Sequence, residues 1–271
     1  MADSKIKIAL VGAAGRMGLE VTRAAARDRD MVIVAGIERT GSPALGKDLG
    51  ELAGLGPSGI TITDNLEQAG AKADVIVDLS LPTATASVVE GARLSKKALV
   101  CGTTGLRTEI IDLFDSAALD IPVLYTPNLS LGVAVTQRVM EQAINALGPG
   151  YDIEIVEMHH RHKGDAPSGT AVALAKTAAL AKGLDPEKDL CFGRFGPVGQ
   201  RRDDEIGVHA VRGGGVFGEH TVILAGEHER IEITHRASSR ALFAQGALKA
   251  ARFIHSKPAG RYSMVQMLFP N

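Results

Sequence analysis

Several residue types that would point to particular functions are scarce in this chain. It has no tryptophan, three tyrosines and seven phenylalanines, so a stacking platform for nucleic-acid bases is not expected. Its 30 lysines and arginines balance 31 aspartates and glutamates, and no bulk charge favours nucleic acid or an anionic membrane surface. No uninterrupted apolar run is long enough to span a bilayer. We therefore expect neither nucleic acid nor membrane as a partner.

Cysteine is also scarce, which bears on compartment and on metal binding. Only Cys101 and Cys191 occur, and they are far apart and without the spacing of metal ligands. The first residues, MADSKIKIALVG, place charge among apolar residues and run straight into glycines, unlike a signal peptide. These features predict a protein of the reducing cytoplasm.

The first half of the chain alternates apolar runs of strand length with helix-like stretches. Strands are expected at residues 5–11, 31–37, 74–79, 98–101 and 122–125. Helices are expected at residues 16–29, 65–70, 84–95 and 108–119. Almost wholly apolar strands separated by helices indicate a parallel sheet covered on both faces. The pattern predicts an α/β domain of the doubly wound, Rossmann-like type.

From about residue 128 the pattern changes. A helix at 133–147 and an alternating strand at 151–158 precede an alanine-rich helix, and strand-like runs follow at 207–212, 220–225 and 229–235. Strands in succession without helices predict an antiparallel sheet in an α+β domain. Ser238 and Ser239 are expected to cap a last helix over 240–256. We place a nucleotide domain at residues 1–128 with 240–271, and a second domain at 129–239.

A glycine-rich segment lies between the first expected strand and helix. It consists of Gly12, Ala13, Ala14, Gly15, Arg16, Met17 and Gly18. Such glycines allow a tight turn and a close approach of backbone to a pyrophosphate. The spacing is G-x-x-G-x-x-G and not the usual G-x-G-x-x-G of dinucleotide-binding turns, so the spacing alone is a weak signal. The context favours a dinucleotide site, because a strand precedes the segment, a helix follows it, and an acidic residue lies about twenty positions further on. A turn that merely caps a helix in a nucleotide-free domain is the alternative.

The acidic residue is Glu38, which could bind the ribose hydroxyls of an adenosine. Its neighbour Arg39 could pair with a 2′-phosphate. Together they predict use of both NADH and NADPH. Two further loops follow expected strands, at the end of the sheet where α/β proteins bind ligands. We expect both to approach the nicotinamide, and the alternative is that they are simple turns. The first loop contains Gly102, Thr103 and Thr104, and the second contains Thr126, Pro127, Asn128 and Leu129.

The most informative stretch is EIVEMHHRHKGDAPSGTA, residues 154–171. His159, His160 and His162 stand beside Lys163, and such groups can donate and accept protons near neutral pH. The segment then opens a helix at Ser168, where free backbone N–H groups attract an anion. This combination predicts a catalytic site for a small carboxylated substrate.

The basic stretch allows two other interpretations. The three histidines could ligate zinc, but adjacent residues of an extended segment point to opposite faces, and Arg161 and Lys163 add positive charge. A solvated basic loop would not explain the helix start that follows. No metal is therefore expected.

Two further patches, residues 212–215 and 218–220, are compatible with simple hairpin turns.

Residues 154–171 resemble the signature of the dihydrodipicolinate reductase family, also called 4-hydroxy-tetrahydrodipicolinate reductases, of the bacterial lysine pathway. The matching positions are Glu154, Ile155, Glu157, His159, Lys163, Asp165, Pro167, Ser168, Gly169, Thr170 and Ala171. The glycine segment, residues 102–104, 218–220 and 232–240 also resemble the family, so the likeness covers essentially the whole chain. One departure is Leu81, where related sequences carry arginine.

The resemblance implies an NAD(P)H-dependent reduction of 4-hydroxy-tetrahydrodipicolinate by a homotetramer whose second domain binds substrate and forms the assembly. It implies that His159 is the acid/base residue and Lys163 the proton donor, that His160 contacts the substrate, and that Gly169 and Thr170 hold a carboxylate. Two alternatives stay open: another two-domain amino-acid dehydrogenase of the aspartate or homoserine type, and a non-catalytic dinucleotide sensor.

Overall fold

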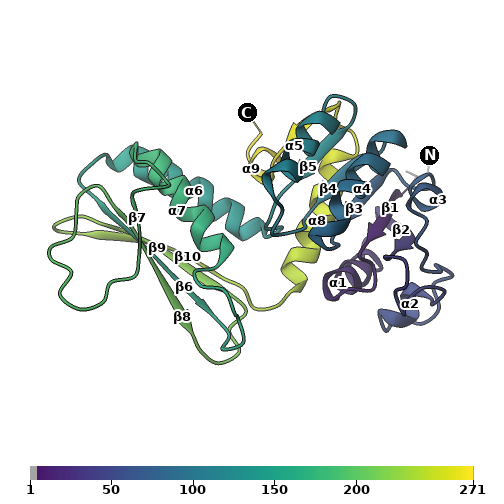
Figure 1. Cartoon of the computed structure of the whole chain (residues 1–271), viewed down its shortest axis with the longest axis horizontal. Helices are drawn as coiled ribbons and strands as arrows, with labels where there is room; N and C mark the ends of the chain where they lie inside the picture. Colours follow the sequence, from purple (N-terminus) through teal and green to yellow (C-terminus); the bar gives the residue numbers. More distant parts are fainter. Residues whose placement is uncertain (1–4, 271) are drawn as a thin grey trace. The chain divides into compact units, whose positions relative to one another are not determined.

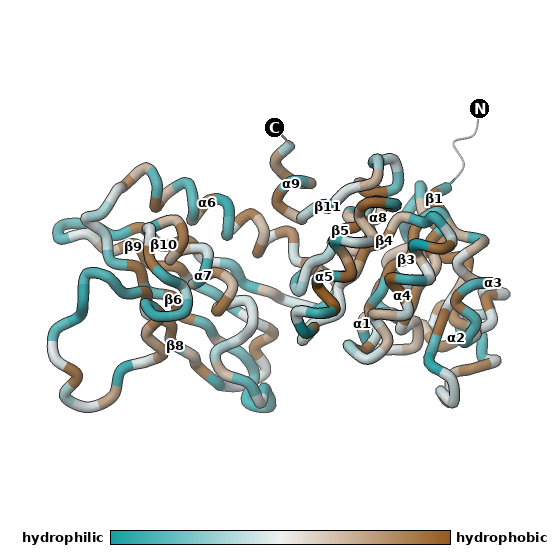
Figure 2. The backbone as a smooth tube through the Cα atoms, turned by 45° about the horizontal axis from the view of Figure 1, so that its top comes forward, coloured by the Kyte–Doolittle hydropathy of each residue, from teal (hydrophilic) through white to brown (hydrophobic). Residues whose placement is uncertain are grey.

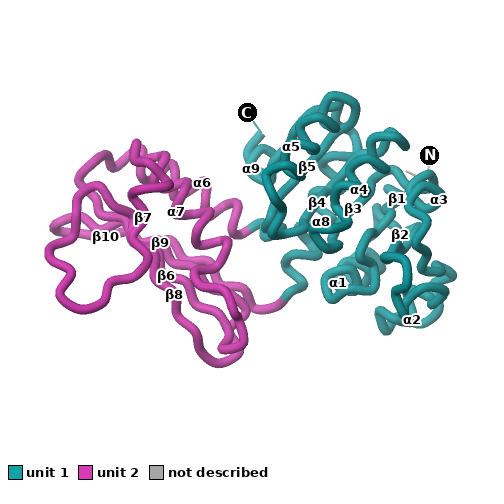
Figure 3. The backbone as a smooth tube through the Cα atoms, in the orientation of Figure 1, with its two compact units in different colours: residues 1–131, 240–271 teal, residues 132–239 magenta. Residues whose placement is uncertain are grey.

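The computed structural model describes residues 5–270, which form two compact units (Figure 3). Unit 1 comprises residues 1–131 and 240–271, and unit 2 comprises residues 132–239. The chain therefore leaves unit 1 once, builds the whole of unit 2, and returns to complete unit 1.

Unit 1 contains a six-stranded parallel sheet in the order β11-β5-β4-β3-β1-β2 (Figure 1). Its strands are β1 (Ile6–Val11), β2 (Met31–Ile37), β3 (Val75–Asp78), β4 (Ala98–Cys101), β5 (Pro122–Tyr125) and β11 (Gly260–Tyr262). All four residues of β3 and of β4 are buried, as required of central strands covered on both faces. The predicted doubly wound α/β domain is confirmed.

Helices cover the sheet of unit 1. They are α1 (Arg16–Ala25), α2 (Leu49–Leu52), α3 (Leu66–Gly70), α4 (Pro82–Leu94), α5 (Thr108–Ala117), α8 (Ala241–Ile254) and α9 (Met264–Leu268). Helix α1 packs against α8, and α4 packs against α3 and α5. The predicted serine cap of α8 is wrong by one or two residues: the cap position is Arg240, and its side chain makes no cap hydrogen bond.

Unit 2 contains a five-stranded sheet in the order β10-β9-β6-β8-β7. Its elements are α6 (Leu131–Leu147), β6 (Asp152–His159), α7 (Gly169–Lys182), β7 (Leu190–Phe192), β8 (Ile206–Arg212), β9 (Glu219–Ala225) and β10 (Arg230–Arg236). The predicted antiparallel sheet is in fact mixed. β9 runs antiparallel to β6 and β10, whereas β8 pairs parallel with β6 and β7. The crossover through α7 is the reason, because it returns the chain to the same end of the sheet.

The core of unit 2 lies between the sheet and its helices. Ile153 and Ile155 of β6 alternate inward and pack with Leu174 and Ala178 of α7. Apolar residues, brown in Figure 2, gather on the strands and helices, and teal polar residues follow the longer connections. Among residues 5–270, no helix is both long and apolar enough to cross a membrane.

Candidate active site

The glycine segment forms the turn between β1 and α1, at the carboxyl edge of the parallel sheet. Gly12 has φ +75°, and a Cβ there would lie 2.7 Å from the carbonyl oxygen of Leu79, so only glycine fits. A Cβ on Gly18 would lie 2.3 Å from the carbonyl oxygen of Gly12. These glycines bring the helix start against the ends of β1 and β3. Ala13 beneath the turn is fully buried.

The amino terminus of α1 is suited to an anion. Its cap residue is Gly15, which offers no side-chain cap, and the first turn contains no acidic residue. By contrast, side chains cap the amino termini of α2, α3, α7 and α9. The first N–H groups of α1, around Arg16 and Met17, therefore keep the partial positive charge that attracts phosphate. This observation fits a dinucleotide pyrophosphate.

A cavity of about 390 Å³ opens beside the glycine turn. Its lining includes Gly12, Gly15, Glu38, Arg39 and Leu81. Glu38, at the end of β2, accepts a hydrogen bond of 2.9 Å from the backbone N–H of Ala14. The structure thus places the glycine turn, Glu38 and Arg39 around one cavity.

The other two predicted cofactor loops follow β4 and β5, neighbouring strands of the same sheet. Gly102 follows β4, and the buried Thr103 donates from its hydroxyl to the carbonyl of Ser80 at 3.3 Å, while Thr104 is exposed. After β5, the Thr126 hydroxyl donates to the carbonyl of Asn128 at 2.8 Å. Pro127 between them is exposed and the next residue, Leu129, is buried. Both loops therefore lie at the carboxyl edge where such sheets bind ligands.

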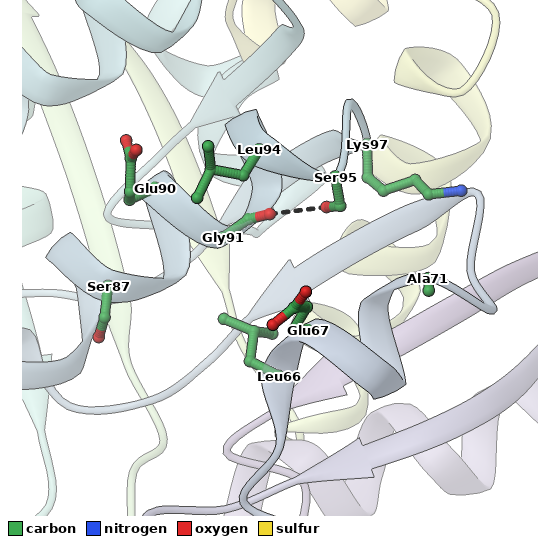
Figure 4. Close-up of a pocket in the computed structure, with 9 residues that line it drawn as sticks. All are labelled: Leu66, Glu67, Ala71, Ser87, Glu90, Gly91, Leu94, Ser95 and Lys97. Atoms are coloured by element: carbon green, nitrogen blue, oxygen red, sulfur yellow. Dashed lines mark hydrogen bonds between the residues drawn. The ribbon is translucent and has the colours of Figure 1, made fainter.

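A second cavity of unit 1, of about 740 Å³, lies beside α3 and α4 (Figure 4). Its lining includes Leu66, Glu67, Leu94 and Ser95, and none of the predicted site residues. The hydroxyl of Ser95 donates to the carbonyl of Gly91 at 2.6 Å. That hydroxyl is therefore bonded within its own helix. Because this cavity contains none of the predicted site residues, the cavity beside the glycine turn is the candidate nucleotide site.

In unit 2, the candidate acid/base residue His159 ends strand β6. Its Nδ1 atom lies 2.6 Å from Oε2 of Glu157, and its side chain is only 12% exposed. A Cβ on Gly218 would lie 2.9 Å from Nε2 of the same ring. The imidazole is therefore held by a carboxylate at one nitrogen and bordered by bare backbone at the other.

Glu157 is fully buried and was not assigned a role from the sequence. Arg212 donates to both of its oxygens at 2.8 Å, and the backbone N–H of Ser168 donates to Oε1 at 2.9 Å. Burial raises the pKa of Glu157, but the hydrogen bonds from Arg212, His159 and Ser168 outweigh it and hold that pKa below its usual range. The carboxylate is therefore ionised at neutral pH.

Helix α7 begins where the sequence predicted. Ser168 is the cap residue, and its hydroxyl accepts a hydrogen bond of 3.1 Å from the N–H of Ala171. Gly169 is exposed and Thr170 is half-buried in the first turn, and that turn contains no acidic residue. Although Ser168 caps one N–H group, the exposed Gly169 makes this helix start reachable from solvent, and the helix dipole favours an anion there.

Lys163 lies in the loop between β6 and α7. Its ammonium is paired with Asp165 at 2.8 Å, and the lysine side chain is 20% exposed. His160 is half-buried, and its ring lies 6.2 Å from that of His162. The loop is tied down at Asp165, whose backbone carbonyl accepts a 2.6 Å hydrogen bond from Arg212.

Two histidines that the sequence interpretation did not place belong to the same cluster. The His220 ring lies 5.3 Å from that of His159 and 6.4 Å from that of His235. His220 Nε2 and Ser168 Oγ share a hydrogen bond of 3.0 Å. Burial, with the positive charge of its histidine neighbours, lowers the pKa of His220 to about 4. It is therefore neutral at physiological pH and acts as a structural partner of the helix cap.

The zinc interpretation was based on His159, His160 and His162. Among residues 5–270, no group of three or more His, Cys, Asp or Glu side chains is placed to hold a metal ion. Cys101 is fully buried beside Asp78, with Sγ 3.4 Å from Oδ2. Burial raises the pKa of its thiol well above the usual value, which removes it as a nucleophile.

One unit is Rossmann-like with an uncapped helix start, and the other carries clustered histidines, a lysine and a candidate anion site; these are the parts of an NAD(P)H-dependent oxidoreductase. Comparisons with known proteins identify the family within this class. Residues 6–129 match the family model described as dihydrodipicolinate reductase, N-terminus, and residues 132–268 match that of its C-terminus. The chain belongs to the dihydrodipicolinate reductase family.

Relatives agree over nearly the full chain. The 4-hydroxy-tetrahydrodipicolinate reductase of Alkalilimnicola ehrlichii is 47% identical over 97% of this chain and 98% of its own. That of Anaeromyxobacter dehalogenans is 45% identical, with 97% of each chain covered. A solved dihydrodipicolinate reductase from Paenisporosarcina sp. TG-14, described as dipicolinate-bound, aligns with a TM-score of 0.75 at 24% identity, over 96% of this chain and 97% of its own.

The same fold occurs in other dehydrogenases. An amine dehydrogenase from Mycobacterium smegmatis aligns with a TM-score of 0.58 at 12% identity, over 97% of this chain and 96% of its own. That likeness shows the fold alone. The family models and the close relatives therefore separate this chain from the amino-acid dehydrogenase alternative, which the fold by itself would have left open.

Proposed function

We propose that this chain catalyses the NAD(P)H-dependent reduction of 4-hydroxy-tetrahydrodipicolinate to tetrahydrodipicolinate in the pathway to diaminopimelate and L-lysine. The names of its close relatives support this substrate. The observation that carries the chemistry is the placement of the His159 ring. Nδ1 of this ring lies against the buried carboxylate of Glu157, which also accepts a hydrogen bond from the backbone N–H of Ser168 at the start of α7. One carboxylate therefore positions both the proposed proton donor and the proposed anion site.

The dinucleotide would bind at the carboxyl edge of the parallel sheet in unit 1. The α1 start would hold the pyrophosphate, and the loops after β4 and β5 would face the nicotinamide. When bound, the cofactor supplies the hydride. Glu38 and Arg39 both line the cavity beside the glycine turn, which supports the use of NADH and NADPH alike: the carboxylate suits ribose hydroxyls and the guanidinium suits a 2′-phosphate.

The substrate's carboxylates would be held by unit 2. Gly169 and Thr170 offer the N–H groups of the α7 start to one of them. Lys163 would exchange its partner Asp165 for the substrate, and His160 would contact the ring. Loss of the 4-hydroxyl with a ring hydrogen, as water, would give the unsaturated ring that accepts the hydride. Hydride addition then leaves an adjacent ring atom basic, and His159, aided by Lys163, would supply the proton. Nε2 is the ring nitrogen free for this step, since Nδ1 is engaged by Glu157.

Assembly and location are also proposals. We propose a homotetramer, which the family resemblance implies. Exposed large apolar side chains of unit 2 support it, among them Phe192, Phe195 and Val198, because such patches commonly mark subunit contacts. The absence of a membrane-spanning helix among residues 5–270 is compatible with a cytoplasmic site of action, and we propose no nucleic-acid or membrane partner.

Substitutions of His159 and Lys163 test whether these residues serve proton transfer and not cofactor binding. His159→Gln and Lys163→Ala should each lower kcat by roughly 10²–10⁴-fold, the contribution of a positioned proton donor. NADH affinity, measured by fluorescence titration, should stay near wild type because the glycine turn belongs to unit 1. His162→Ala is the matched control and should be much milder, since that exposed ring has no assigned role. Full kcat with lost cofactor binding in Lys163→Ala would contradict the assignment.

A further inference from the structure

We propose that Glu157 is a positioning residue of the reaction: it fixes which nitrogen of His159 carries the ring proton and ties that ring to the anion-binding start of α7. The inference rests on the proposed function, because it assumes that His159 and α7 face the substrate. It concerns a residue that itself touches neither substrate nor cofactor.

Glu157 occupies an inward-facing position of its strand. In β6 the residues that alternate inward are Ile153, Ile155 and Glu157, so a carboxylate occupies the third place of an apolar series. Burying a charge there is costly unless it is fully paired. A side chain that only had to fill the core would be apolar. The charge is therefore best explained by the groups it binds.

The partners of Glu157 belong to two different parts of the site. Oε2 faces the Nδ1 of His159 and Oε1 accepts from the backbone N–H of Ser168, while Arg212 donates one N–H to each oxygen. One carboxylate thus connects the acid/base ring, at 2.6 Å, with the cap residue of α7, at 2.9 Å. Moving it would displace both parts of the site together.

Glu157 also fixes the tautomer of His159. An ionised carboxylate can only accept hydrogen bonds, so the Nδ1 of His159 must carry a hydrogen. The neutral ring then presents a lone pair at Nε2, and the charged ring presents an N–H there. Nε2 points toward Gly218, whose missing Cβ leaves room. Glu157 therefore aims the reactive nitrogen and stabilises the protonated ring.

Other charged and titratable groups lie around Glu157 and His159, in contact with them or with their neighbours. Arg212 comes from β8, His220 from β9 and His235 from β10, while Lys163 and Asp165 come from the loop before α7. Burial lowers the pKa values of His220 and His235, so both rings are neutral where the enzyme would work. Among these groups, Glu157 is the carboxylate in direct contact with His159, with Oε2 at 2.6 Å from Nδ1.

Unit 2 contains a matched structural counterpart. Glu154, also on β6, accepts from Arg194 and Arg201 and lies 2.6 Å from His209 Nε2. It has the same carboxylate, histidine and arginine composition, but these bonds go to Arg194, Arg201 and His209 and not to the start of α7. A role in stability alone would make the two glutamates equivalent. A positioning role would separate them.

The experiment compares Glu157→Gln with Glu154→Gln in the full-length protein. We expect Glu157→Gln to lower kcat on the order of 10²-fold, the low end of what a positioned proton donor contributes. Without the negative charge, the protonated ring is less favoured, so the fall of kcat with rising pH should begin at lower pH. Glu154→Gln should keep kcat and its pH dependence within about twofold, even where thermal unfolding shows that both variants are destabilised.

A second readout does not depend on turnover. NMR of the imidazole nitrogens, with His159→Gln assigning the signal, should show Nδ1 protonated in neutral His159 of the wild type and a mixed tautomer in Glu157→Gln. If Glu157→Gln does not fold, the wild-type spectrum and the milder Glu157→Asp decide. An Nε2-protonated ring, or equal kinetics in the two glutamine variants, would overturn the inference. An inactive wild type would instead refute the proposed function and leave the tautomer result standing.

Discussion

At the scale of single residues, some side chains of the candidate site in unit 2 can be recognised from the sequence and others cannot. His159 and Lys163 are conspicuous, because cationic side chains crowd a short segment. Glu157 and His220 are not, because a carboxylate in a strand and a histidine near a turn usually face solvent. A usable signal existed: Glu157 continues the inward series of β6, where an apolar residue is expected. Arg212 could not be paired with it from sequence, since their contact needs the register between β6 and β8.

A residue-scale prediction concerns Gly218. A Cβ there would lie 2.9 Å from His159 Nε2, and the backbone has φ +152°, a conformation that side-chain-bearing residues avoid. Gly218→Ala should displace the ring and lower kcat by up to about 10²-fold, since small misplacements of a catalytic group are costly. Gly215→Ala is the control, because an added Cβ there meets no atom within 4 Å. Steady-state kinetics with both variants would settle it, and equal activity would show that Nε2 needs no such clearance.

At the scale of helices and strands, periodicity located most of the structure. β2, β4 and β5 have the predicted bounds, and the helices of the first half differ by a few residues at their ends. The elements that were missed are short: α2, β7, β11 and α9 have three to five residues each. Segments of that length carry too little periodicity to detect, and β7 and β11 exist only because a sheet edge is available to pair with.

The direction of β8 was out of reach for a different reason. Sequence spacing shows that β8, β9 and β10 follow one another, which favours antiparallel pairing. Yet β8 enters beside β6 after the long connection through α7, and lies parallel to it. That choice brings Arg212 at the end of β8 opposite His159 at the end of β6. The unpredicted topology is therefore what completes the site.

At the scale of the whole molecule, the nucleotide-binding unit is built from both ends of the chain. The family models divide between residues 129 and 132, next to the change of unit, and the C-terminal model continues through α8 back into unit 1. Helix α8 packs on α1 and on the central strands, so residues after 240 are needed to cover the sheet. The glycine turn therefore depends on a segment that is far away in sequence.

The proposed assembly belongs to this scale. If unit 2 forms the subunit contacts through its exposed apolar side chains, the protein should sediment as a homotetramer at micromolar concentration. Phe195 is 98% exposed in the single chain, and burying such a ring would stabilise association by roughly 1.5–3 kcal/mol. Phe195→Ser should therefore weaken the tetramer, as measured by sedimentation velocity across a dilution series. A clean monomer of the unmodified chain would contradict the proposal.

The central claim is that this chain reduces 4-hydroxy-tetrahydrodipicolinate with a nicotinamide cofactor. The most direct measurement mixes the purified protein with NADH or NADPH and supplies the substrate from the synthase that makes it, while nicotinamide absorbance is followed. We predict oxidation of both cofactors that begins only when the synthase and its substrates are present and that His159→Gln lowers by at least about 10²-fold. Oxidation of neither cofactor by the folded wild type, with the synthase shown to be active, would contradict the account.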